Sequence, residues 1–177
     1  MTPQRKKTKP AFSISPRLVR RAGELTALLR LKKKTLITAE SCTGGLIAAA
    51  LSQTDGASDV LEGGFVTYTK AQKTRSLGVG ATVLKRNGAV AGEIARRMAL
   101  GALKRSRAKI ALAVTGVLGP KPDDDGNPVG LVFFACAKSR GKVEVLRQRF
   151  DRCSHDRLRS LTVLIALDMV ERTLRKK

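Results

Sequence analysis

The sequence predicts an α/β fold in which helices cover a mixed β-sheet, and three observations predict it. Apolar segments of strand length alternate along the chain with segments whose apolar residues recur at helical spacing. Two strand-like segments near the C-terminal end are joined by a short polar turn, which is typical of an antiparallel hairpin. The length of 177 residues and the hydrophobic fraction of 42% suit a single domain. Alternation favours parallel strands and the hairpin adds antiparallel ones, so the sheet should be mixed.

The first element should be a helix that begins at Ser15. Serine is a good helix cap, and Pro16 suits the first helical position. Residues 1–14 carry basic side chains, no acidic ones and no apolar run of the kind found in secretory signals. We therefore expect a disordered basic tail over residues 1–14 and a single domain over residues 15–177.

The remaining elements follow from apolar patterning and from turn residues. Gly78 predicts the end of a short helix, and Asn87-Gly88 predicts a turn. In chain order we expect a strand at 35–39, a helix at 46–52, a strand at 64–68, a helix at 70–77, a helix at 92–106, strands at 109–114, 129–137 and 143–150, and a closing helix at 156–175.

The chain is strongly basic, with 35 Lys and Arg against 14 Asp and Glu and a formal charge of +21. Such a charge attracts phosphate backbones, so weak non-specific nucleic-acid binding is one expectation. A solvated basic surface without a partner is the commoner explanation. The chain has no Trp and one Tyr, which argues against base stacking.

Other classes of protein are excluded by what the sequence lacks. No apolar run approaches the ~18 residues of a membrane helix. The three cysteines include no Cys-x-x-Cys pair, which favours a reducing compartment and a cytoplasmic protein. His155 is the only histidine, so sites with two histidine ligands are excluded. We expect no metal and no cofactor.

Residues suited to chemistry gather where three predicted strands end. Residues 38–45 carry Ser41 and Thr43 and open a helix with two glycines. Free N–H groups at such a helix start favour an anion or an oxyanion. Alternatively, Ser41 or Thr43 caps the helix and the glycines only form the turn.

Two further segments bring polar groups to strand ends. Residues 64–73 carry Tyr68 and Lys73, and glycine-rich loops follow the strand at 109–114. Together the three segments predict one shared pocket at the edge of the sheet. For Tyr68 and Lys73 the alternative is an ordinary half-buried or surface side chain.

Six short motifs occur in order along the chain: Ala-Glu-Ser-Cys-Thr-Gly-Gly at 39–45, Val-Thr-Tyr at 66–68, Leu-Gly-Val at 77–79, Gly-Ala-Val at 88–90, Thr-Gly at 115–116 and Pro-Val-Gly at 128–130. This set resembles the C-terminal domain family of the competence/damage-inducible protein CinA. The resemblance implies a three-layer α/β/α sandwich. Stand-alone members of that family are nicotinamide mononucleotide (NMN) deamidases, which release ammonia and leave nicotinic acid mononucleotide.

The resemblance also implies the roles of individual residues. Ser41 would be the nucleophile, Lys73 the base and Tyr68 their neighbour. A buried lysine can act as a base once its pKa falls toward neutrality. Self-association stays open, since the Ala-rich helix at 46–52 suits either a core or an interface. We expect the substrate NMN to be held by Glu40, Thr43, Gly44, Gly45, Thr115 and Gly116.

The chain departs from the family pattern at five places around this site. Asn is usual at Lys70, Ser at Ala91, a smaller residue at Leu118, glycines and a lysine around Asp123–Asp125, and an arginine at His155. Ala91 should deprive a helix of its cap. Lys70 could either lower the pKa of Lys73 by repulsion or enter the pocket and pair with Asp123–Asp125.

Alternatives therefore stay open for the site and for the function. Cys42 could be the nucleophile, or a small buried neighbour of Ser41. Asp123–Asp125 could bind a divalent cation, or form a solvated acidic loop. The chain is predicted to be an NMN amidohydrolase; the alternative is an inactive or re-specialised paralogue with a basic partner-binding or nucleic-acid-binding role.

Overall fold

Five strands form one mixed sheet in the order β2-β1-β3-β4-β5. The computed structural model describes residues 13–151 and 153–176. Strand β1 runs parallel to β2 and β3, whereas β4 runs antiparallel to β3 and β5, as the alternation and the hairpin predict. The strands are β1 (Leu36–Glu40), β2 (Leu61–Val66), β3 (Ile110–Gly116), β4 (Leu131–Lys138) and β5 (Val143–Arg149).

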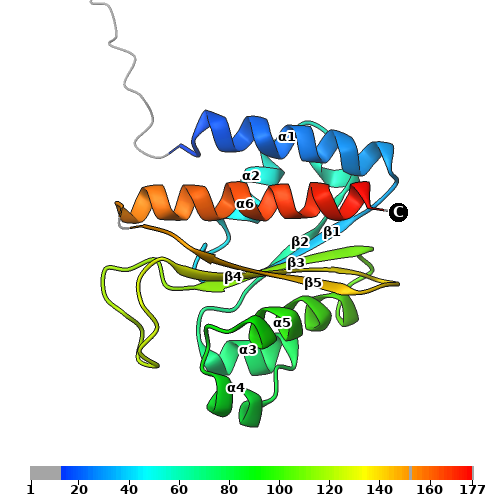
Figure 1. Ribbon diagram of the computed structural model, residues 1–177. Helices are drawn as coiled ribbons and strands as arrows, with labels where there is room; N and C mark the ends of the chain where they lie inside the picture. The colour runs from blue at the N-terminus through cyan, green and yellow to red at the C-terminus, as the bar shows by residue number, and fades with distance from the viewer. Residues whose placement is uncertain (1–12, 152, 177) are drawn as a thin grey trace, which may run out of the picture.

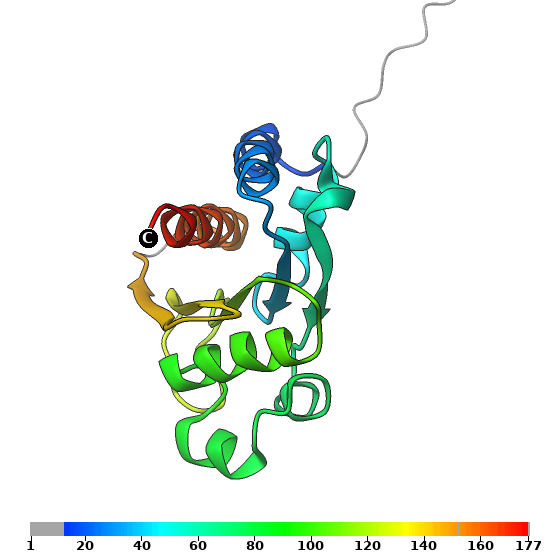
Figure 2. The same ribbon diagram turned by 90° about the vertical axis from the view of Figure 1, so that its right-hand side faces the viewer.

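Helices cover both faces of the sheet, which confirms the three-layer α/β/α sandwich (Figures 1 and 2). One face carries α1 (Pro16–Leu31), α2 (Leu46–Ser52) and α6 (His155–Arg175). The other carries α3 (Lys70–Leu77), α4 (Ala81–Asn87) and α5 (Gly92–Lys104), and a short 3-10 helix (Ala57–Asp59) precedes β2. Among the described residues, no helix is both long and apolar enough to cross a membrane.

The central strands contribute side chains alternately to two cores. In β3, Leu112 packs beneath α1 and α6, whereas Ala111 and Ala113 face α5. The small alanines leave room for α5 to approach closely. A Cβ at Gly101 of α5 would lie 2.0 Å from the Leu77 carbonyl oxygen, so only glycine fits where α5 crosses α3.

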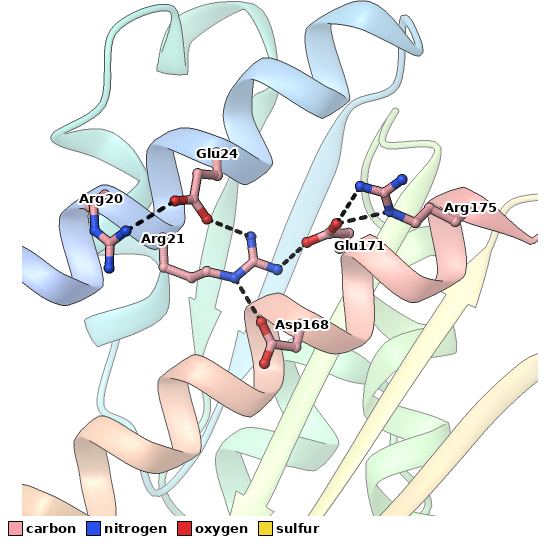
Figure 3. A network of polar contacts seen from close by, with 6 residues as sticks. All are labelled: Arg20, Arg21, Glu24, Asp168, Glu171 and Arg175. Atoms are coloured by element: carbon pink, nitrogen blue, oxygen red, sulfur yellow. Dashed lines mark hydrogen bonds and ion pairs between the residues drawn. The ribbon is translucent and has the colours of Figure 1, made fainter.

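Helices α1 and α6 also hold each other through a polar network above the core (Figure 3). Arg21 of α1 donates to Asp168 of α6 at 2.7 Å and to Glu171. Glu24 and Arg175 extend the network along their own helices. The first and last helices are therefore joined by charge as well as by apolar contact.

Two expected elements need correction. The strand predicted at 64–68 begins at Leu61 and ends at Val66, because Thr69 leaves the sheet to cap α3 by accepting from the Gln72 N–H at 3.1 Å. Asn87 is not in an isolated turn but ends α4, a helix that the sequence pattern missed. Only Leu84 of α4 is buried, so this helix has no apolar period to detect.

The boundary of the predicted tail also shifts. Residues 1–12 lie outside the described residues. Ile14, predicted within the tail, is 9% exposed and packs in the core that α1 covers. The hydrophobic gain of burying an isoleucine side chain accounts for its inclusion in the domain.

Candidate active site

Ser41 stands directly after β1, where the chain leaves the sheet. Its backbone N–H donates to the Val114 carbonyl of β3 at 3.0 Å, which continues the strand pairing by one residue. Its side chain is almost buried and lines a cavity. The sheet thus fixes the backbone of Ser41 and leaves Oγ at the cavity wall.

Lys73 lies beneath Ser41 and is fully buried. Its Nζ donates to Ser41 Oγ at 2.8 Å, to the Thr67 carbonyl at 2.8 Å and to the Tyr68 carbonyl at 3.3 Å. The Thr69 cap determines where α3 begins, and Lys73 follows one turn later. Three acceptors therefore hold the amine in one position.

Burial lowers the pKa of Lys73 to about 8, since water no longer stabilises the ammonium form. Roughly a tenth of the molecules then carry a neutral Lys73 amine at pH 7. A neutral amine at hydrogen-bond distance can accept the Ser41 hydroxyl proton. The family resemblance implied this pair, and the structure brings the two groups within hydrogen-bond distance.

The cavity beside Ser41 has a volume of about 490 Å³, within the range of small-molecule sites. Tyr68 lines it with a side chain that is 71% exposed, while its backbone carbonyl holds Lys73. The described lining consists of Ser41, Cys42, Tyr68, Thr69, Lys70, Ala89, Val90, Thr115–Gly119, Lys121, Asp123–Asp125 and His155.

Glu40 has a structural role in place of the predicted contact with substrate. It is fully buried and does not belong to the cavity lining. Its carboxylate accepts from the backbone N–H groups of Ile47 and Ala48 at 3.0 and 2.9 Å. An internal carboxylate thus occupies the start of α2, so the anion site predicted there is already filled by the protein itself.

Thr43, Gly44 and Gly45 shape the turn between β1 and α2 and also lie outside the cavity lining. The Thr43 hydroxyl donates to Glu40 at 2.7 Å, and the Gly44 N–H donates to the Ser41 carbonyl at 3.1 Å. Gly45 has φ +93°, a conformation that favours glycine. The alternative of a capped turn is therefore closer to the structure, with Glu40 satisfying the helix start in place of Ser41 or Thr43.

Thr115 and Gly116 do line the cavity, at the end of β3. The Thr115 hydroxyl donates to the Ala89 carbonyl at 2.8 Å, so it holds the loop between α4 and α5 in place. A Cβ at Gly116 would lie 2.7 Å from the Leu131 carbonyl oxygen. Gly116 thus allows β4 to pass close to the site.

Lys70 takes the second of its two predicted roles. Its Nζ donates to Asp125 at 2.7 Å, which lowers the pKa of that carboxyl. Asp125 also accepts from the Ala89 N–H at 3.1 Å. These two bonds draw the acidic loop across the rim of the cavity. The lowered pKa of Lys73 comes mainly from burial, without a contribution from Lys70.

The other carboxylates of this loop are used within the protein or face solvent. Asp123 accepts from the N–H groups of Asp125 and Asn127 at 3.1 and 2.7 Å, and Asp124 is exposed. In the part of the chain that the structure describes, no group of three potential metal ligands lies together. The loop therefore fits its second interpretation, an acidic loop.

The remaining departures have separate outcomes. Leu118 is 5% exposed and packs into the core beneath α6, so its bulk is directed mainly into the protein. His155 begins α6 and stands half-exposed at the cavity. Cys42 is half-buried and lines the cavity, but desolvation raises the pKa of its thiol to about 12, which leaves it protonated near neutrality and argues against Cys42 as the nucleophile.

Some functional groups were missed because they belong to the backbone or to distant loops. The Thr67 carbonyl holds Lys73, yet a carbonyl has no sequence signature. Ala89 and Lys121 reach the cavity from loops that only the tertiary fold brings together. The Gly-Ala-Val motif at 88–90 was the one available signal for Ala89.

Comparison with known proteins gives consistent matches over most of the chain. The model of the CinA C-terminal domain matches residues 20–174. A curated relative from Acetivibrio thermocellus, whose name describes it as competence-damage inducible, is 46% identical over 143 residues, covering 80% of this chain and 34% of its own. A CinA-like protein from Citrifermentans bemidjiense is 43% identical over 150 residues, covering 85% of this chain and 36% of its own. The chain thus spans about a third of the length of these curated relatives.

Solved structures match over the whole fold. The competence/damage inducible protein CihA from Agrobacterium tumefaciens has a TM-score of 0.87 and 40% identity, covering 93% of this chain and 100% of its own. A CinA superfamily protein from Escherichia coli has a TM-score of 0.83 and 31% identity, covering 93% and 95% of the two chains.

Proposed function

This chain belongs to the CinA C-terminal domain family, and we propose that it is an amidohydrolase that converts NMN and water to nicotinic acid mononucleotide and ammonia. One observation carries the proposal: the Nζ of the buried Lys73 lies 2.8 Å from the Oγ of Ser41, at the wall of an open cavity. The family resemblance supplies the substrate.

In the proposed reaction, neutral Lys73 takes the Ser41 hydroxyl proton while Oγ bonds to the carboxamide carbon. The C–N bond then breaks, and the Lys73 ammonium gives its proton to the leaving nitrogen as ammonia departs. Water attacks the resulting ester, with Lys73 taking the water proton and returning it to Ser41 Oγ. Lys73 acts as base and acid in turn, which suits a pKa of about 8.

The cavity supports a mononucleotide substrate. The exposed ring of Tyr68 offers an apolar face to a flat aromatic ring. Lys70, Lys121 and His155 place donors around the same cavity, where a phosphate could be bound. Asp125 already pairs with Lys70, so a phosphate would have to compete with it or use the other two groups.

The test is an ammonia-release assay with NMN, run on the wild type and on Ser41→Ala and Lys73→Ala. Both substitutions should lower kcat/KM by at least ~10³-fold, as removal of a nucleophile or its base does in other hydrolases. Lys85→Ala, on the exposed face of α4, is the matched control and should keep full activity. Circular dichroism confirms that each variant is folded. A folded wild-type protein that does not hydrolyse NMN would contradict the proposal.

The second candidate is a non-catalytic paralogue with a binding role, and one observation favours it. The Lys70–Asp125 contact draws an acidic loop over the rim of the cavity. Asp125→Asn separates the two: under the amidohydrolase proposal it should leave turnover in place, with KM as the altered constant. A wild type and a variant that both bind NMN without turning it over would favour the paralogue.

A further inference from the structure

A hollow of about 280 Å³ lies at the opposite end of the sheet, and six of its nine lining residues are basic; the other three are Ile110, Ser139 and Leu174. We call it the cationic hollow. Its basic residues are Lys32, Lys34, Lys109, Lys138, Arg140 and Lys176. They come from the α1–β1 loop, the start of β3, the β4–β5 hairpin and the end of α6, near the C-terminal end in Figure 1.

The cationic hollow is separate from the candidate active site. Lys34 precedes β1 and Ser41 follows it, so about 16 Å of extended strand divides them. Lys109 precedes β3, whereas Thr115 lies near the far end of the same strand. Substitutions in the hollow can therefore be made without touching the cavity beside Ser41.

Backbone hydrogen bonds tie the segments of the hollow together. The Lys109 N–H donates to the Thr35 carbonyl at 3.1 Å, and the Ser139 N–H donates to the Lys109 carbonyl at 2.9 Å. The Lys138 amine donates to the Lys176 carbonyl at 3.0 Å. The cations are thus carried on paired segments of the fold.

The charge of the hollow is barely compensated. Lys176 pairs with Glu144 at 2.7 Å. Within residues 13–151 and 153–176, no carboxylate lies within ion-pair distance of the other five basic side chains. An adjoining hollow shares Lys34 and adds Lys33; it also contains Arg30, whose charge is paired with Asp59 at 3.0 Å. A concave surface of one sign concentrates the electrostatic potential and attracts polyanions.

We propose that the cationic hollow binds nucleic acid through the phosphodiester backbone, without reading the bases. Clustered lysines neutralise successive phosphates and release counterions, which gives binding without sequence preference. No aromatic side chain lines either hollow in the described structure, so base stacking has no platform there. Among the described residues, Leu31 is the only exposed large hydrophobic residue that adjoins a basic residue of the hollow in the chain, and one such side chain is too little to insert into a lipid surface. This proposal stands apart from the proposed amidohydrolase function.

The test compares two triple variants that remove the same charge. Lys34→Gln/Lys109→Gln/Arg140→Gln alters the hollow, while Arg75→Gln/Lys85→Gln/Arg86→Gln alters exposed residues of α3 and α4. Fluorescence anisotropy measures the binding of a labelled random-sequence 20-bp DNA duplex across a salt series. The hollow variant should bind on the order of 10-fold more weakly at 50 mM salt, and the slope of log K against log salt should fall by about 2 to 3. The control variant should stay close to wild type.

Four outcomes would overturn the proposal. Equal loss in both triple variants would mean that total charge alone binds DNA. Loss on deletion of residues 1–12, with none in the hollow variant, would place binding in that segment. Binding to phosphatidylserine vesicles but not to DNA would make the hollow a lipid-surface site. A wild type that binds inorganic tripolyphosphate but not DNA would make it a site for a small anion.

Discussion

Lys73 is the residue on which the chemistry of the site depends, because burial brings its pKa to about 8. A lysine in water would stay charged to pH ~10.4 and could not act as a base near neutrality. The ammonium form retains three acceptors, so the site holds both protonation states in one geometry. Lys73 can therefore accept a proton in one step and donate it in the next.

The lowered pKa of Lys73 predicts the pH dependence of the reaction. The neutral fraction of Lys73 grows about tenfold per pH unit below its pKa, so kcat/KM for NMN should rise with pH and level off above about 8. A steady-state pH series from 6 to 9.5 measures it. A flat profile across that range would exclude Lys73 as the base.

The same pKa shift predicts a stability effect. The unfolded chain keeps the lysine proton up to pH ~10.4, whereas the folded protein loses it near pH 8. Between these values the unfolded state binds more protons, so folding becomes more favourable as the pH rises. Compared with Lys73→Met, the wild type should therefore gain free energy of unfolding from pH 8 to 10. Urea titrations of both proteins measure the difference, and parallel pH curves would contradict it.

Substitution of Glu40 should affect the stability of the fold more than the chemistry of the site. Glu40→Gln keeps the shape but removes the charge that the Ile47 and Ala48 N–H groups bind, and its NH2 group replaces the acceptor of one of these two donors. The expected loss is about 2–3 kcal/mol of unfolding free energy. Glu62→Gln, an exposed glutamate on β2, should change stability by less than about 0.5 kcal/mol. Equal effects in the two urea titrations would reject the role given to Glu40.

At the scale of elements, local signals predicted helices better than strand ends. The helix α3 matches its predicted bounds, since Gly78 has φ +69° and ends it as a local cap. The start of β2 was misplaced, because parallel pairing with β1 determines which residues belong to the strand. That pairing joins segments more than twenty residues apart, and no local signal carries it.

The start of α5 offers a way to stabilise the protein. Ala91 is the N-cap of α5 and provides no side-chain hydrogen bond. Ala91→Ser should add about 1 kcal/mol to the free energy of unfolding, because a serine hydroxyl can accept from a free N–H of the first turn. Ala81→Ser, one residue past the cap of α4, adds the same hydroxyl and should gain nothing. Thermal and urea unfolding of both variants test the difference.

For the whole molecule, the contact between α1 and α6 joins the two ends of the described fold (Figure 3). Arg21 lies between Glu24, Asp168 and Glu171, and its side chain is only 18% exposed. Without Arg21, Asp168 would lose its ion pair with α1 and Glu171 would keep only Arg175 of its own helix. The network therefore secures the helical layer that covers one face of the sheet.

Arg21→Gln should lower the free energy of unfolding by about 1–2 kcal/mol at low salt, and by less in 1 M salt, where repulsion is screened. Arg20→Gln is the control, since Arg20 is 75% exposed and meets Glu24 only at 3.6 Å. Its expected change is below about 0.5 kcal/mol. Urea titrations at both salt concentrations measure these changes. A loss of unfolding free energy that does not depend on salt would mean that Arg21 stabilises the fold by packing and not by charge.

Apolar periodicity and turn residues are local properties of the chain, and they were enough to predict the α/β class and most helices, whereas the pairing of Ser41 with Lys73 followed from the resemblance to a known family. Three contacts of the site are visible only in the folded protein: the Glu40 carboxylate binds the start of α2, the Thr67 carbonyl accepts from Lys73, and Asp125 pairs with Lys70. Folding also brings six basic residues from separate segments together in the cationic hollow. Burial and long-range contacts decide these features, and both arise only when distant segments pack together.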